Sequence, residues 1–80
     1  MPTKLIRIVN KNERYYILNI TPTLFGEFCL ERIYGASRYK NPTRKIQSFF
    51  LSIDEANSEY TFLLKNKLSK GYQILKKLNL

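Results

Sequence analysis

Five cationic side chains and two tyrosines lie within one short stretch of the chain, between Glu27 and Lys45. With the glycine among them, the candidate site residues are Arg32, Tyr34, Gly35, Arg38, Tyr39, Lys40, Arg44 and Lys45. Cationic groups bind phosphates and aromatic rings pack on sugars or bases, so this mixture is typical of a nucleic-acid-binding surface. No acidic residue lies between Glu31 and Asp54, so we expect this charge to have no local neutralisation. The alternative is a solvated hairpin decorated with Lys and Arg.

The composition of the chain narrows the classes of function. Fourteen Lys and Arg against six Asp and Glu give a net charge of +8 over 80 residues. Such an excess favours nucleic acid or another anionic partner. Cys29 is the single cysteine and there is no histidine, which excludes an internal disulfide, a Cys-based zinc site and His-dependent catalysis. We therefore expect no cofactor and no metal.

The apolar residues are spread in short runs rather than gathered in one long segment. None of these runs approaches the roughly 20 residues that a membrane-spanning helix needs, and no charged-then-apolar leader is visible at the start of the chain. We therefore expect no membrane span, no signal peptide and a cytoplasmic location. A length of 80 residues predicts a single domain, residues 1–80, with one small core.

The first fifty residues alternate between apolar and polar side chains, which is the pattern of strands. In the clearest of these strands, Tyr16, Leu18 and Ile20 face one way and their neighbours face the other. The four predicted strands span residues 4–10, 14–21, 27–34 and 43–51. A basic loop is expected from Gly35, where the chain can bend, to Pro42. Four strands with short connections favour an antiparallel meander.

The period then changes to that of a helix. Ser52 and Glu55 form a capping box at its start, and Gly71 is well placed to end it. The predicted apolar face consists of Ile53, Ala56, Tyr60, Leu63, Leu64 and Leu68. That face is wide enough to cover one side of a sheet. The sequence therefore predicts an α+β fold, an antiparallel sheet of four to five strands with one helix packed across it.

Three features of the helix and tail leave alternatives open. Phe62 falls opposite the apolar face, and we expect a chain terminus to cover it, although it could instead contact a partner. Lys65, Lys67 and Lys70 are expected to be solvated and to complement the helix dipole, although they could extend a binding surface. The tail from Tyr72 to Leu80 could add a short strand or a frayed helix.

The order of these elements resembles the WGR domain, a module of DNA-dependent poly(ADP-ribose) polymerases and of bacterial proteins. The resemblance covers residues 14–72. Its landmarks are Arg14 to Leu18, Leu24-Phe25-Gly26, Leu30 to Ala36, Phe50 to Ala56, and Lys70-Gly71-Tyr72, which resembles the ending of bacterial members. Tyr34 stands where the family writes its signature Trp, and Ala36 stands where it writes Arg. Gly35 alone keeps the signature.

The resemblance implies a non-catalytic nucleic-acid-binding module with weak sequence specificity, with DNA favoured over RNA as its partner. In the polymerases, the signature Trp packs near a terminal nucleotide and basic neighbours hold the backbone, while the signature Arg contacts other domains. Tyr34 keeps a flat ring for that packing, and its alternative is a core aromatic at the end of the sheet. Ala36 puts the interdomain role of its position in doubt. The chain is expected to be a monomer or a homodimer.

Two further classes of function are alternatives to nucleic-acid binding. A protein-interaction or adaptor module could dock on a partner protein or self-associate, through an open sheet edge or Phe62. An enzyme is not expected, because Asp54, Glu55 and Glu59 suit a capped helix start. Cys29 is expected to be buried and inert in mid-strand, since no His is present to activate it.

Overall fold

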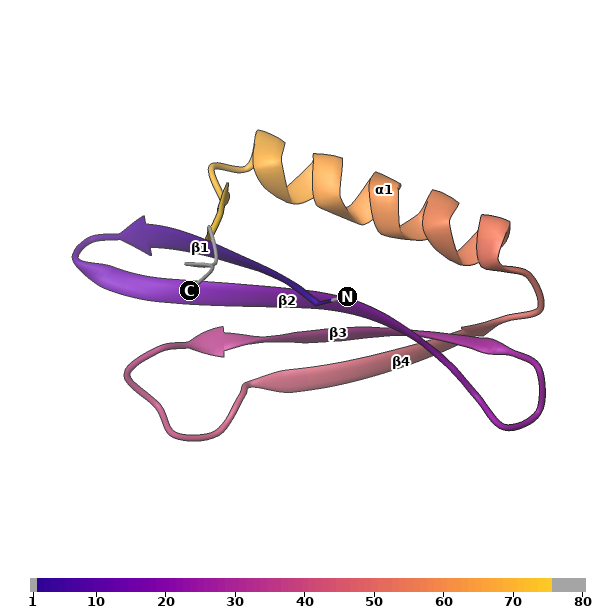
Figure 1. Cartoon of the computed structure of the whole chain (residues 1–80). Helices are drawn as coiled ribbons and strands as arrows, with labels where there is room; N and C mark the ends of the chain where they lie inside the picture. The colour runs from indigo at the N-terminus through magenta and orange to yellow at the C-terminus, as the bar shows by residue number, and fades with distance from the viewer. Residues whose placement is uncertain (1, 76–80) are drawn as a thin grey trace, which may run out of the picture.

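The fold is a single antiparallel sheet with one helix lying across one of its faces (Figure 1). It is seen in a computed structural model that describes residues 2–75. The elements are β1 (Thr3–Val9), β2 (Asn12–Pro22), β3 (Phe28–Ala36), β4 (Arg44–Phe50), α1 (Ile53–Ser69) and β5 (Gln73–Ile74). The strand order is β4-β3-β2-β1-β5, so the predicted α+β architecture and meander are confirmed. No helix of residues 2–75 lies on the other face of the sheet, which we call the open face.

The strand boundaries differ from the prediction at the turns. The first strand was expected to reach Asn10, but Asn10 and Lys11 both adopt positive φ, of 50° and 66°, and form the β1–β2 turn. β3 continues to Ala36, so the following loop begins at Ser37 and not at Gly35. In the tail, Gln73 and Ile74 pair with β1 as a short fifth strand. The rest of the predicted tail element, residues 76–80, lies outside the described residues.

The core lies between α1 and the face of the sheet that the alternation predicted. Leu5, Tyr16, Leu18 and Leu30 are buried there. From the helix, Ala56 is buried, and Tyr60, Leu63 and Leu64 pack against this cluster. The predicted division of side chains between the two faces of the sheet is therefore confirmed. Burial of large aliphatic side chains contributes about 1.5–3 kcal/mol each, which makes this layer the main source of stability.

Both ends of α1 are defined by their caps. The amide of Glu55 donates to Ser52 Oγ (3.1 Å), and Ser52 Oγ donates in turn to Glu55 Oε1 (3.2 Å). At the other end, the amide of Tyr72 donates to Lys67 O (3.1 Å), and the amide of Gly71 donates to Leu68 O (3.2 Å). These two bonds form a Schellman motif around Gly71, whose φ is +97°. The predicted start and stop of the helix are confirmed.

Four side chains of α1 depart from the prediction. Ile53 and Leu68, expected in the apolar face, are exposed, while Lys67 is half-buried against the sheet. The apolar face is therefore shorter at both ends, and a cation continues it at the C-terminal end. Phe62 is 64% exposed, so the described part of the tail does not cover it as expected. Within residues 2–75, the helix is neither long nor apolar enough to cross a membrane.

Candidate nucleic-acid interface

The β1–β2 turn and the β3–β4 loop lie together at one end of the molecule, and the C-terminus of α1 points toward the same end (Figure 1). It does so because α1 starts where β4 ends and runs back along the sheet. We call this the basic end. Among the described residues, this end carries eight cations and one carboxylate, Glu13. The cations are Arg7, Lys11, Arg14, Arg38, Lys40, Arg44, Lys67 and Lys70. The cations gather at this end because the path of the chain brings together residues that are distant in sequence.

Cross-strand pairs set cations side by side on the helix-covered face. Arg7 of β1 lies directly opposite Arg14 of β2, and both are exposed. Like charges that face each other across a sheet destabilise it. Arg44 of β4 lies opposite Tyr34 of β3. Its guanidinium joins those of Arg7 and Arg14 on this face, and it lies beside the Tyr34 ring. This arrangement would be favoured by an anion that binds between the guanidinium groups.

An aromatic cluster lies at the inner border of the basic end. The rings of Tyr16 and Tyr34 stack with centroids 5.4 Å apart and an interplanar angle of 7°. Tyr72 meets Tyr16 edge-on at 6.2 Å. The ammonium of Lys67 lies 4.5 Å from the centroid of Tyr16 and 5.7 Å from that of Tyr72. Lys67 is therefore held in place by cation–π contacts and not solvated as expected.

Burial perturbs two groups of this cluster. The pKa of Lys67 is lowered, first by desolvation and then by the positive charges of Lys70 and Arg32. The pKa of Tyr16 is raised, again mainly by burial, while a hydrogen bond with Arg32 acts in the opposite direction. The direction of the Lys67 shift indicates a partly desolvated ammonium that is repelled by the positive charges of Lys70 and Arg32. A phosphate oxygen entering the cluster would relieve the repulsion between Lys67 and Arg32.

Lys45 is the exception to the expected lack of neutralisation. Its ammonium lies 3.3 Å from Glu31 Oε2, which also accepts from Gln47 Nε2 at 3.1 Å. This is the single ion pair within the part of the chain that the structure describes. It lies on the open face, because Lys45 pairs with Ile33 in the β3–β4 register. The expectation was therefore wrong for Lys45, whereas no carboxylate of residues 2–75 forms an ion pair with the cations of the basic end.

The β3–β4 loop is fastened to the neighbouring turn. The amide of Ser37 donates to Glu13 O (2.9 Å), and Ser37 Oγ donates to the Glu13 carboxylate. Arg38 donates to Asn12 Oδ1 (3.3 Å), and its guanidinium carbon lies 4.9 Å from the ring centroid of Tyr39. These contacts bring the two hairpin tips together, so their cations lie close to one another.

Gly35 has a packing role rather than the bending role predicted. It is buried within β3, and a Cβ there would lie 2.8 Å from Thr43 N, 3.1 Å from Tyr15 Oη and 3.2 Å from Pro42 Cα. The contact with Thr43 involves backbone, and that amide donates to Tyr34 O (2.9 Å). The absence of a side chain at Gly35 thus lets the returning chain approach closely at the root of the loop.

The structure divides the predicted site residues between two faces and a tip. Arg32, Tyr34 and Arg44 lie on the helix-covered face, because they share the parity of Leu30 and Tyr16. Arg38, Tyr39 and Lys40 form the tip of the loop, and Gly35 and Lys45 face the opposite side. The sequence reasoning missed Arg7, Lys11 and Arg14. It also placed Lys67 in solvent, although Lys67 continues the spacing of Tyr60, Leu63 and Leu64.

The fold and this site define a small α+β module with a strongly polarised surface and a glycine-rooted basic loop. Comparison with known families gives the identity of that module: the family model of the WGR domain matches residues 3–78. The chain belongs to the WGR domain family. No curated protein and no solved structure matches the chain.

Proposed function

We propose that this chain is a non-catalytic nucleic-acid-binding module with DNA as its ligand. The observation that carries the proposal is the basic end, where eight cations stand against one carboxylate beside a tyrosine cluster. Membership of the WGR family supports the same function. Such a concentration of unpaired cations suits a polyanion whose phosphates replace the missing counter-charges.

The proposed contacts fall into two groups. Exposed cations at and beside the tips would follow the sugar–phosphate backbone: Lys11, Arg14, Arg38 and Lys40. Arg32, Arg44 and Lys67 would hold one phosphate beside Tyr34. Since Tyr16 covers one face of the Tyr34 ring, the other face alone is available to a sugar or base. Contacts of this kind position a protein without reading sequence.

The remaining reactive groups support a binding role rather than catalysis. Cys29 is buried, and burial together with the Glu31 carboxylate raises the pKa of its thiol, which disfavours the nucleophilic thiolate. Asp54 and Glu55 lie in the first turn of α1, where carboxylates stabilise a helix. A buried, unpaired cysteine also fits the reducing cytoplasm.

Fluorescence anisotropy tests the proposal directly. Labelled duplex, nicked and single-stranded DNA, with RNA of the same sequence, would be titrated at low and at physiological salt. We expect binding to DNA with log Kd rising by about 4 to 5 units per decade of salt, which corresponds to roughly five phosphates neutralised. An absence of binding at low salt, despite the charge of +8, would contradict the proposal.

A further inference from the structure

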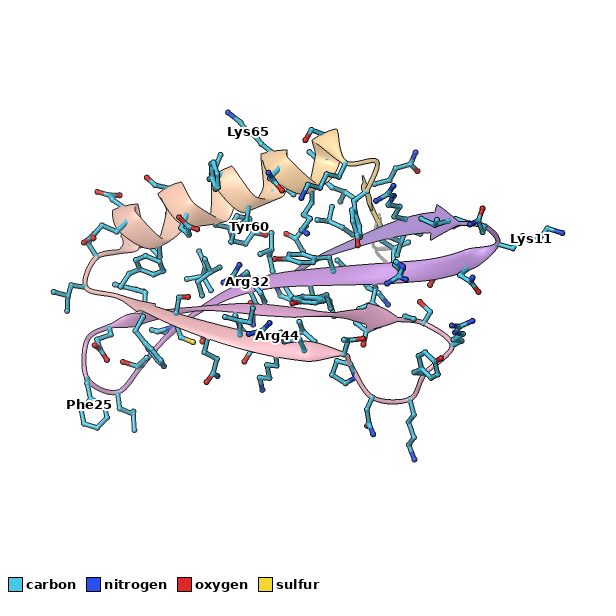
Figure 2. The ribbon with its side chains drawn as sticks, turned by 180° about the vertical axis from the view of Figure 1, so that it is seen from behind. Lys11, Phe25, Arg32, Arg44, Tyr60 and Lys65 are labelled. Carbon is cyan, nitrogen blue, oxygen red and sulfur yellow. The ribbon has the colours of Figure 1, made fainter. Side chains whose placement is uncertain are left out.

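The end of the molecule opposite the basic end is rich in exposed apolar side chains. Figure 2 shows Phe25 there, and Lys11 at the far extreme. Leu24 is 99% exposed, Phe25 88% and Leu51 80%. Phe49 and Ile53 are also exposed. The β2–β3 loop and the β4–α1 junction lie together, because Phe28 pairs with Phe50. We call these five residues the apolar end. Clusters of exposed large apolar side chains mark interaction sites.

The loop that carries Leu24 and Phe25 is closed by its own hydrogen bonds. The amide of Thr23 donates to Glu27 O (2.8 Å). Thr23 Oγ1 accepts from the amides of Phe25 and Glu27, each at 3.2 Å. Gly26 supplies the positive φ of +80° that the turn requires. The two apolar side chains are thus presented outward by a defined loop, which lowers the entropic cost of binding.

An open hollow lies beside this surface. It has a volume of about 300 Å³ and is lined by Ile20, Ile53, Asn57 and Tyr60, between the end of β2 and the start of α1. Ile53 belongs to both the hollow and the apolar end. An apolar side chain of a partner can enter the hollow, where Asn57 offers a polar group, while the Tyr60 hydroxyl is already hydrogen-bonded to Thr3 Oγ1.

The charges at this end define the partner. Residues 15–31 and 46–64 contain no Lys or Arg. The carboxylates of these segments, apart from the paired Glu31, are Glu27, Asp54, Glu55 and Glu59. Carboxylates around an apolar surface repel phosphate, which argues against nucleic acid and anionic membranes as occupants. Two copies meeting apolar end to apolar end would also oppose their carboxylates.

We propose that the apolar end docks a basic amphipathic segment of a partner protein, in which a row of apolar side chains is flanked by Lys or Arg. The apolar row packs on Phe25 and Leu51 and enters the hollow, and the cations meet Glu27, Asp54 and Glu59. The protein would then join this partner to whatever the basic end holds. This site is independent of the proposed nucleic-acid interface.

The test uses the complete chain and a labelled synthetic peptide of about 14 residues, with Leu at helical spacing and Lys elsewhere. A matched peptide has each Leu replaced by Ser and keeps the charge. We expect the Leu-containing peptide to bind and the Ser-containing peptide to bind at least tenfold more weakly. The double variant Phe25→Ser, Leu51→Ser should lose at least tenfold in peptide affinity with unchanged affinity for DNA.

Variants that remove carboxylates at one end or the other show where the peptide binds. Glu27→Gln with Glu59→Gln should weaken peptide binding several-fold, whereas Glu13→Gln at the basic end should not. Equal affinity for both peptides, or full affinity in the Phe25→Ser, Leu51→Ser variant, would overturn the proposal. So would a wild-type oligomer in sedimentation velocity that this variant disperses, because a second copy would then be the occupant. If the double variant fails to fold by circular dichroism, Phe25→Ser alone decides.

Discussion

The two ends of this molecule use opposite physical chemistry on the same sheet and helix. The basic end gathers eight cations and one carboxylate around two loops that are tied to each other. The apolar end presents Leu24 and Phe25 on a loop tied to itself, without a cation nearby among residues 2–75. Salt screens contacts between charges but leaves apolar contacts intact or strengthens them. Binding at the basic end should therefore weaken much more steeply with salt than binding at the apolar end.

The largest expected effect is the loss of the exposed arginines of the basic end. Replacing Arg14, Arg38 and Arg44 by Ala should weaken DNA binding by about 100-fold at low salt and reduce the salt slope by about 2.7, for three lost phosphate contacts. Because these side chains are exposed, stability should change little. Anisotropy titrations in a series of salt concentrations measure both quantities.

A triple variant of equal charge provides the control. Lys4 and Lys45 lie on the open face, and Lys65 points away from the sheet (Figure 2). Replacing these three by Ala removes the same charge outside the basic end and should reduce affinity only a few-fold. Equal losses in the two triple variants would mean that net charge, and not the basic end, binds DNA.

The next effect concerns the glycines at the two ends. Gly35→Ala should destabilise the protein by about 2 kcal/mol, because its Cβ would overlap the Thr43 backbone at 2.8 Å. Gly26→Ala meets nothing within 4 Å but must adopt φ of +80°, which costs about 1 kcal/mol. Urea denaturation monitored by circular dichroism measures both. A larger loss for Gly26→Ala would reverse the roles assigned to the two glycines.

Tyr34 provides a smaller test of the aromatic contact. Tyr34→Leu should weaken DNA binding by about tenfold, since base–aromatic stacking contributes roughly 1–3 kcal/mol. It should also cost about 1 kcal/mol of stability through the lost stack on Tyr16. Tyr34→Phe keeps the ring and should bind like the wild type. Full affinity in the Leu variant, by anisotropy, would assign Tyr34 to the core alone.

The smallest effect is a pH dependence that arises from Lys67. Its pKa lies below the ordinary value, mainly because of desolvation and then because of Lys70 and Arg32. The charged form therefore costs stability at neutral pH, and this cost is relieved as the pH rises through the lowered pKa. Its contribution to DNA binding is lost over the same range, by a few-fold.

Lys67→Arg should remove this part of the pH dependence, because arginine stays protonated throughout. The comparison of anisotropy curves cancels the contribution of other groups that titrate in the range. Identical pH profiles for the wild type and the variant would show that Lys67 does not contact the ligand.

Local patterns in the sequence were sufficient for most of the fold. The alternation of Tyr16, Leu18 and Ile20 and the cap at Ser52 depend on neighbours a few residues away, and the structure agrees with each. The predicted strand boundaries were wrong where a contact between distant segments sets the end of the strand. β3 runs past Gly35 because Gly35 and Ala36 pair with Tyr15 and Arg14 of β2, and no single-segment pattern contains that pairing.

The candidate site was harder to predict because it is assembled from four separate parts of the chain. Reading one stretch found Arg32, Arg38 and Arg44, but the cations of β1 and β2 join them only through strand register. The same stretch included Lys45, which the pleat turns to the other face. The helical spacing of Lys67 with Leu63 and Leu64 was enough to predict that it faces the sheet, but its charge favoured a position in solvent.

The separation of charge has a consequence for how the protein approaches a ligand. Cations at one end and carboxylates at the other, on a molecule with principal-axis extents of 42 × 29 × 24 Å, give it a permanent dipole along its length. In the field of a polyanion, that dipole experiences a torque that turns the β3–β4 loop forward before contact. The protein would therefore meet nucleic acid mostly with its basic end, and the apolar end would face away from it.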